Sequence, residues 1–98
     1  IDSKIHNGAD DNASGVATVL FLAEYLQENL ANLNLKRNVI FLLTDAEEGG
    51  LIGSQQFVID NYLEKLHVSA NVNIDMVSRV DNKHRRNENY IYVCGTDI

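Results

Sequence analysis

The sequence has little of three features that would assign its class at once: long apolar runs, cysteines and basic residues. No segment approaches the ~18 apolar residues of a membrane span, and no signal-peptide pattern opens the chain, so we expect no membrane partner. A lone cysteine, Cys94, excludes an internal disulfide and leaves the cellular compartment undecided. The net charge of −6 argues against nucleic acid as a partner.

The composition that remains is that of one small globular domain. The chain has 98 residues, of which 45% are hydrophobic and 22% are charged, both ordinary values. A chain of this length can bury about 60–65% of its unfolded surface. Much of the acidic excess lies in two short clusters, at 10–11 and 45–48, which indicates a site more than an evenly solvated surface.

The hydrophobic pattern predicts helices and strands in alternation. Apolar residues recur at helical spacing over about 13–32, which predicts a helix capped by Asp11, Asn12 or Ser14. This order of elements predicts an α/β fold with a right-handed parallel crossover between the first two strands. The elements after the first helix are a strand over 37–44, a looser helix over 51–66, a strand over 68–76, a polar loop over 78–89 and a strand over 90–94.

Acidic residues lie where the first two predicted strands end. Asp45, Glu47 and Glu48 follow the first strand, and Asp75 lies near the end of the second. The carboxyl ends of neighbouring parallel strands share one edge of a sheet, about 5 Å apart, and ligands of open α/β sheets bind there. The acidic pair at 10–11 could reach the same edge. Because hard divalent cations accept several carboxylates at once, the convergence of these three segments predicts a metal site.

Each acidic segment also has an ordinary structural interpretation. Acid-rich loops after strands are common on protein surfaces, and an acidic pair before a helix is a typical cap. Asp75 ends an apolar run, so we expect it to be partly buried and to need a hydrogen-bond network or a metal.

The other residues with reactive side chains are interpreted as surface or packing residues. His6 lies beside the acidic pair and could be a ligand, although an exposed loop position is the favoured interpretation. His84 is interpreted as a solvated residue of a basic loop. Tyr90 and Tyr92 lie on one side of the last predicted strand, where packing is the usual role. Cys94 has no histidine at a spacing that would indicate a nucleophile.

Three motifs together resemble those of the co-catalytic zinc aminopeptidase family. They are GADDNASGVA at 8–17, TDAEEGGLIGS at 44–54 and NIDMV at 73–77. They occur in the order and spacing of that family, which includes bacterial leucyl aminopeptidases and, more distantly, glutamate carboxypeptidases. The resemblance implies a three-layer α/β/α zinc-exopeptidase fold with a mostly parallel sheet, a peptide substrate and two bound Zn²⁺ ions.

The resemblance also implies a role for each of four acidic residues. Asp11 resembles the aspartate that bridges the two zinc ions, Glu48 a ligand of one ion and Asp75 a ligand of the other. Glu47 resembles the general base that takes a proton from the metal-bound water. Two dications ~3.5–4 Å apart polarise a scissile carbonyl, and a carboxylate beside them can pass the proton to the leaving amine.

The sequence departs from the family pattern in its histidines. The family has a His-x-Asp motif upstream of the bridging aspartate and a second ligand histidine downstream. His6 lies too close to Asp11 to match the first, and His84 comes too early to match the second. The implied ligands that remain are all carboxylates, whereas zinc usually also takes nitrogen or sulfur. We therefore expect residues 1–98 to be the core segment of a single zinc-peptidase domain, truncated at both ends, with little activity and weak zinc binding by itself.

Three other functions stay open at this point. The first is a peptidase-like domain that has lost catalysis and serves as a binding or scaffold module. The second is another enzyme on the same scaffold, such as a dipeptidase, a carboxypeptidase or a glutaminyl-cyclase-like protein. The third is a structural α/β domain whose acidic residues have no chemical role. Relatives are often exported, but the sequence decides neither the localisation nor the oligomeric state nor the substrate side chain.

Overall fold

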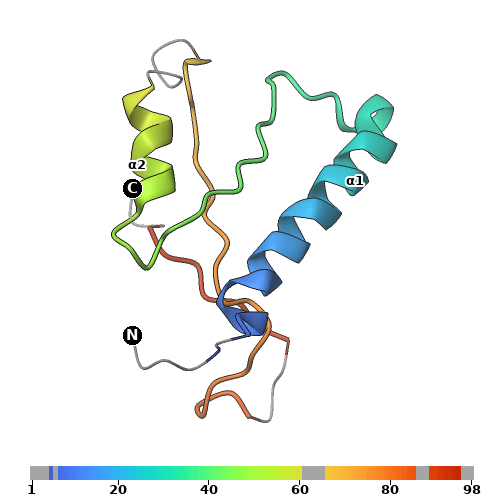
Figure 1. Ribbon diagram of the computed structural model, residues 1–98. Helices are drawn as coiled ribbons and strands as arrows, with labels where there is room; N and C mark the ends of the chain where they lie inside the picture. Colours follow the sequence, from blue (N-terminus) through green and yellow to red (C-terminus); the bar gives the residue numbers. More distant parts are fainter. Residues whose placement is uncertain (1–4, 6, 61–65, 86–88, 96–98) are drawn as a thin grey trace. The chain divides into compact units, whose positions relative to one another are not determined.

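The computed structural model describes residues 5, 7–60, 66–85 and 89–95. Its elements are a π-helical turn η1 (Ala9–Ser14), a long helix α1 (Gly15–Leu33) and a short helix α2 (Ile52–Ile59). Figure 1 shows the two α-helices as coiled ribbons, joined by extended or irregular chain. The chain divides into two compact units, one formed by Ile1–Leu22 with Ile74–Ile98 and the other by Ala23–Asn73.

The first helix confirms the prediction for 13–32 to within two residues. α1 begins at Gly15, whose N–H donates to the side-chain Oδ1 of Asn12 at 2.9 Å. Asn12 is thus one of the three predicted caps, and it satisfies a backbone donor that the first turn of a helix leaves free. The preceding turn is interrupted by non-helical dihedral angles at Asp11 (φ −109°, ψ 94°) and Asn12 (φ −130°, ψ 41°).

The second helix is shorter than the predicted span of 51–66. α2 ends in a turn at Asp60, whose N–H donates to the carbonyl of Gln56 at 3.0 Å. Residues 61–65 of the predicted helix lie outside the described residues. The loose apolar periodicity of this stretch is consistent with a helix of only two turns, since it defines no single apolar stripe.

The predicted three-layer α/β/α fold with a parallel sheet is wrong for this structure. The described residues form helices, turns and irregular chain, and none of them forms a strand. The segments 37–44, 68–76 and 90–94 are present as non-helical chain that forms no sheet ladder. Apolar side chains from Val39 to Leu43 are 42–53% exposed, which excludes the buried central strand that the sequence predicted.

The physical reason is that an apolar run encodes burial, whereas a strand also needs a second backbone beside it. The segment 74–78 illustrates this difference. The amides of Met76, Val77 and Ser78 donate to side chains of the turn that precedes α1, at 3.1–3.3 Å. Because side chains satisfy these donors, they are not available for a ladder with a neighbouring strand.

Burial is concentrated at this polar contact. Among the described residues no hydrophobic side chain is buried, whereas Asp10 is 8% exposed and Gly15 is also buried. The best-shielded part of the described chain is therefore built from polar groups around the start of α1. No helix in the parts of the chain that the structure describes has the length and apolar character to cross a membrane.

Candidate functional site

The candidate site is organised by a polar seam, which we define as the side chains of Asp10, Asn12 and Ser14 with the backbone of 74–78. The first three alternate in sequence with exposed residues, so they share one side of the turn. Ser14 Oγ donates to the carbonyl of Asp10 at 2.6 Å and accepts from the N–H of Val77 at 3.1 Å. Figure 1 shows this turn in blue at the start of α1, beside the orange segment that follows Ile74.

Asp10 is the buried charge of the seam. Its Oδ1 accepts hydrogen bonds from the N–H of Ser78 at 3.1 Å and from Ser78 Oγ at 2.6 Å. Its Oδ2 lies 3.8 Å from Nε of Arg79, whose side chain is largely exposed. Asp10 therefore has partners for both oxygens, as a buried carboxylate requires, and its role is structural.

Asn12 contacts the backbone on both sides of Asp75. Its Nδ2 donates to the carbonyl of Ile74 at 3.0 Å, and its Oδ1 accepts from the N–H of Met76 at 3.3 Å. One side chain thus joins the segment that carries Asp11 to the segment that carries Asp75. The family resemblance implies that Asp11 and Asp75 are both zinc ligands.

Asp11 and Asp75 are both exposed. The expectation that Asp75 is partly buried is therefore wrong, because its neighbours contact the seam through their backbone while no sheet forms to cover its side chain. Within the described residues, neither carboxylate has a hydrogen bond or an ion pair, so both remain available as ligands. The peptide bond between Asp11 and Asn12 is cis.

The second acidic segment forms a compact turn that leads into α2. The carbonyls of Asp45, Ala46 and Glu47 accept hydrogen bonds from the N–H groups of residues 50–53 at 2.8–3.2 Å. A Cβ on Gly53 would lie 2.7 Å from the Asp45 carbonyl, so a side chain there would prevent this close approach. Side chains after the turn add two bonds to its backbone, from Gln55 Nε2 to the Gly50 carbonyl at 2.8 Å and from Ser54 Oγ to the Leu51 carbonyl at 3.0 Å. The exposed carboxylates of Glu47 and Glu48 make no hydrogen bond within the described chain.

The predicted convergence of three acidic segments is thus supported for one pair of segments. The seam connects the Asp11 segment with the Asp75 segment, both in the first unit, whereas Glu47 and Glu48 belong to the second unit. Across the described residues, no group of three or more His, Cys, Asp or Glu side chains is placed so as to hold a metal ion. The convergence of all four acids remains a prediction.

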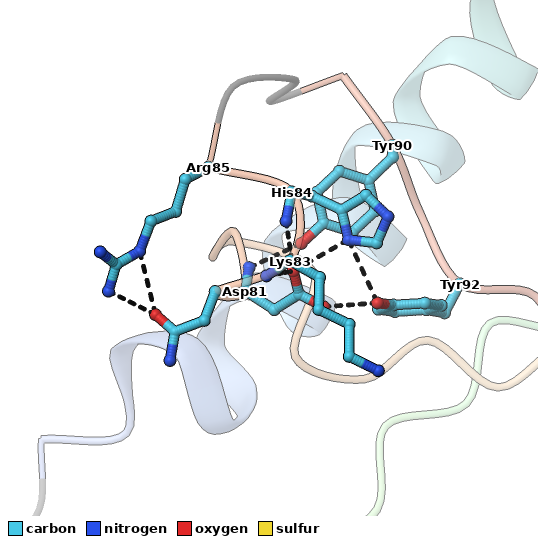
Figure 2. Close-up of polar contacts among 7 residues, drawn as sticks. Asp81, Lys83, His84, Arg85, Tyr90 and Tyr92 are labelled. Carbon is cyan, nitrogen blue, oxygen red and sulfur yellow. Dashed lines mark hydrogen bonds and ion pairs between the residues drawn. The ribbon is translucent and has the colours of Figure 1, made fainter.

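A separate cluster of aromatic and charged side chains surrounds Asp81 (Figure 2). Oδ1 of Asp81 accepts from the N–H groups of Lys83 and His84 and lies 2.8 Å from Nδ1 of His84. Tyr92 Oη donates to Oδ2 of Asp81, and the N–H of Asp81 donates to Tyr90 Oη at 2.6 Å. The Asp81 cluster therefore joins the polar loop to the last predicted strand segment.

These contacts correct the interpretation of His84 as a solvated residue. The ring of His84 lies 4.1 Å from the ring of Tyr90 and 5.7 Å from that of Tyr92, so His84 is a packed residue of the cluster. The two tyrosines, which are two positions apart, contact it from the same side of their segment. Tyr92 is 66% exposed, and the hydroxyl groups of both tyrosines hydrogen-bond to Asp81, so the packing role that the sequence favoured stays a prediction. His6 lies outside the described residues.

Hydrogen bonding shifts two pKa values within the Asp81 cluster. The hydrogen bond from Tyr92 lowers the pKa of the Asp81 carboxyl well below its usual range, and the donors of His84 and Lys83 add to this effect. The same bond, with the negative charge of Asp81, raises the pKa of Tyr92 from 10.0 to about 12. The pair is therefore most stable with Asp81 ionised and Tyr92 protonated.

Sequence reasoning missed the residues that build the seam and the Asp81 cluster. Asn12 and Ser14 were predicted only as possible helix caps, and Ser78 only as part of a polar loop. Polar side chains at positions 10, 11, 12 and 14 indicate a polar side of the turn before α1. Nothing in the sequence indicated which backbone that side would contact.

Comparison with known proteins identifies the family of the chain. The model of peptidase family M28 matches residues 1–90. The chain belongs to peptidase family M28. The resemblance to zinc aminopeptidases is thereby confirmed at the level of the family, whose members are generally zinc-dependent.

A relative from Saccharomyces cerevisiae agrees with this assignment. It is named "Probable aminopeptidase YDR415C" and is 37% identical to the chain over 75 residues. The match covers 74% of this chain and 20% of the yeast protein, so the chain spans about a fifth of the length of that relative. No solved structure matches the chain.

Proposed function

We propose that this chain is part of a zinc-dependent aminopeptidase of family M28, which hydrolyses N-terminal peptide bonds. The observation that best supports the proposal is the Asn12 contact, which joins the segments of Asp11 and Asp75. Family membership and the name of the yeast relative support the same reaction. The proposed ligands are Asp11, Glu48 and Asp75, with Glu47 as the general base.

These side chains supply oxygen ligands that zinc accepts, and the nitrogen or sulfur ligands that zinc usually also takes would come from other parts of the complete protein. Zn²⁺ accepts carboxylate oxygens at about 2.0–2.2 Å, and the carboxylates of Asp11 and Asp75 are exposed and without a competing partner in the described chain. A zinc pair, when bound, polarises the scissile carbonyl and stabilises the negative charge that develops on its oxygen. Asp11, Glu48 and Asp75 would hold the metal.

The proposed role of Glu47 as the general base is supported by the independence of the turn from its side chain. Its backbone carbonyl accepts the N–H groups of Gly50 and Leu51 at 2.9 and 2.8 Å, so the turn does not depend on the side chain. The free carboxylate can accept a proton from the attacking water and donate it to the leaving amine. Its neighbour Glu48 lies on the same irregular turn, where adjacent side chains can point in different directions.

The test is Glu47→Gln in the complete protein, with Glu28→Gln on the exposed surface of α1 as the matched control. The amide has the shape of the carboxylate but cannot accept the proton, so we expect kcat to fall by at least about 10²–10⁴-fold with bound zinc unchanged. The control retains wild-type kcat. Loss of zinc from Glu47→Gln would identify Glu47 as a ligand, and unchanged turnover would exclude it as the base.

Substrate choice tests the reaction class. The complete protein is assayed with amino-acid p-nitroanilides that carry either a free or an acetylated α-amine. An aminopeptidase cleaves the free amines and rejects the acetylated ones. Cleavage of neither substrate, with zinc bound, would favour a peptidase-like domain without catalysis.

A further inference from the structure

We propose that Asn12 is a positioning residue for the metal ligands, because it fixes the segment of Asp11 against the segment of Asp75. The proposal rests on the proposed function, which assigns both aspartates to zinc. Asn12 itself has no ligand role here. Its carboxamide holds the backbone at the residues on either side of Asp75, so it determines where that residue lies along the seam.

The hydrogen-bond pattern of Asn12 fits an amide and no other side chain of its size. Nδ2 faces the carbonyl of Ile74, whereas Oδ1 faces two N–H groups, those of Met76 and Gly15. A carboxylate would place an oxygen against the Ile74 carbonyl, and a leucine would satisfy none of the three groups. The amide thus takes the place of a neighbouring strand, with a donor and an acceptor for one stretch of backbone.

Gly15 gives an independent indication that the contact is built into the fold. Gly15 is buried, and a Cβ at this position would lie 2.5 Å from the carbonyl oxygen of Ile74. The same Cβ would lie 2.8 Å from Nδ2 of Asn12. Since real Cβ atoms do not approach so closely, the start of α1 can meet the Ile74 segment only because residue 15 has no side chain.

The seam also leaves the carboxylate of Asp11 without a partner among the described residues. Its neighbours Asp10 and Asn12 contact 74–78 through their side chains, while Asp11 between them is exposed. Two residues of the turn therefore bind the partner segment, and the proposed ligand between them remains available to a metal.

The experiment compares Asn12→Ser with Asn29→Ser in the complete protein. A serine at position 12 can still cap α1 but is too short to reach both sides of Asp75. Asn29→Ser makes the same change on α1, outside the seam, where the amide donates to the Tyr25 carbonyl at 2.8 Å. Calorimetric titration with Zn²⁺ measures metal affinity, and thermal unfolding measures stability. We expect Asn12→Ser to weaken zinc binding by about 10–100-fold, as losses of residues that orient metal ligands do, and Asn29→Ser to leave it within about threefold of wild type.

Further titrations separate a failure of this inference from a failure of the proposed function. Asp11→Ala in the same assay must abolish or strongly weaken zinc binding if the proposed ligand is correct. Wild-type zinc affinity in Asn12→Ser, with binding still lost in Asp11→Ala, would overturn the positioning role alone. Zinc binding that does not respond to Asp11→Ala, or no binding by the wild type, would overturn both proposals. If Asn12→Ser fails to fold, Asn12→Asp is used instead, because it retains the side-chain volume. A zinc affinity of Asn12→Asp below that of the wild type supports the positioning role. An affinity at or above that of the wild type overturns it.

Discussion

The polar seam and the acidic turn at 45–53 hold proposed site residues in two different ways. The hydrogen bonds of the seam join residues 62–68 positions apart and run from side chains to backbone. The backbone bonds of the acidic turn join residues no more than eight positions apart, such as Asp45 and Gly53. Local geometry therefore suffices to form the acidic turn, whereas the seam exists only when two distant segments meet.

This difference has a consequence for mutation. In the seam, the structural residue Asp10 lies next to the proposed ligand Asp11. A change at Asp10 should therefore affect stability, and a change at Asp11 should affect metal binding. In the acidic turn, the backbone provides the structure and the side chains are free for chemistry, so side-chain changes there should affect activity more than stability.

The largest effect on stability is expected for Gly15→Ala. The added methyl group would overlap the Ile74 carbonyl and the Asn12 amide, at a cost of about 1–3 kcal/mol in the free energy of unfolding, despite the higher helix propensity of alanine. Gly49→Ala is the control, because a Cβ there would meet the flexible end of Ile52 at 3.1 Å and the Ala46 carbonyl at 3.4 Å, an ordinary contact distance. Thermal unfolding of the complete protein gives the difference, and a stabilised Gly15→Ala variant would contradict the close approach in the seam.

A smaller loss of stability is expected for Asp10→Ala. The change removes the acceptor of two hydrogen bonds from Ser78, one of them from its backbone. Because Ser78 is exposed and water can replace this acceptor, we expect the free energy of unfolding to fall by about 0.5–1.5 kcal/mol. Faster hydrogen exchange of the amides at 76–78 would locate the loss in the seam. The comparison is Glu48→Ala in the acidic turn, which we expect to change stability by no more than about 0.5 kcal/mol. Equal losses in the two variants would mean that the turn also depends on its side chains.

The smallest effect is expected for Tyr92→Phe, in the Asp81 cluster. Because the pKa of Tyr92 is raised from 10.0 to about 12, its contribution to stability is complete below pH 10 and disappears as the pH rises through 12. The contribution of Asp81, whose pKa is lowered, is complete above its ordinary value of 3.8 and is lost only at strongly acidic pH.

Ultraviolet titration of tyrosinate measures this pair. The wild type should show one tyrosine that ionises near pH 12, and Tyr92→Phe should remove that component. Asp81→Asn should lower the pKa of Tyr92, since the negative charge that stabilises the protonated phenol is lost. Tyr25→Phe on α1 is the control and leaves the component in place. If the component persists in Tyr92→Phe, the Asp81–Tyr92 bond does not exist in solution.

Local features of the fold were predictable from the sequence. The apolar spacing gave α1 to within two residues, and Asn12 was one of the three caps that the sequence predicted. The beginning of α2 was also predicted closely, because the turn before it depends on contacts between residues near one another in the chain. The parallel sheet was wrong, since apolar runs such as 38–43 give no information on which backbone lies beside them.

The sequence by itself determined the family and the residue types of the candidate site. The three motifs that pointed to zinc peptidases contain Asp11, Glu47, Glu48 and Asp75 in a fixed order, and family M28 membership follows from the same stretch of chain. Only the tertiary structure decided that Asn12 joins Asp11 to the segment of Asp75. The physical reason is that a carboxamide can bond to any nearby donor and acceptor, and the choice among them depends on which distant backbone the fold brings within 3.0–3.3 Å.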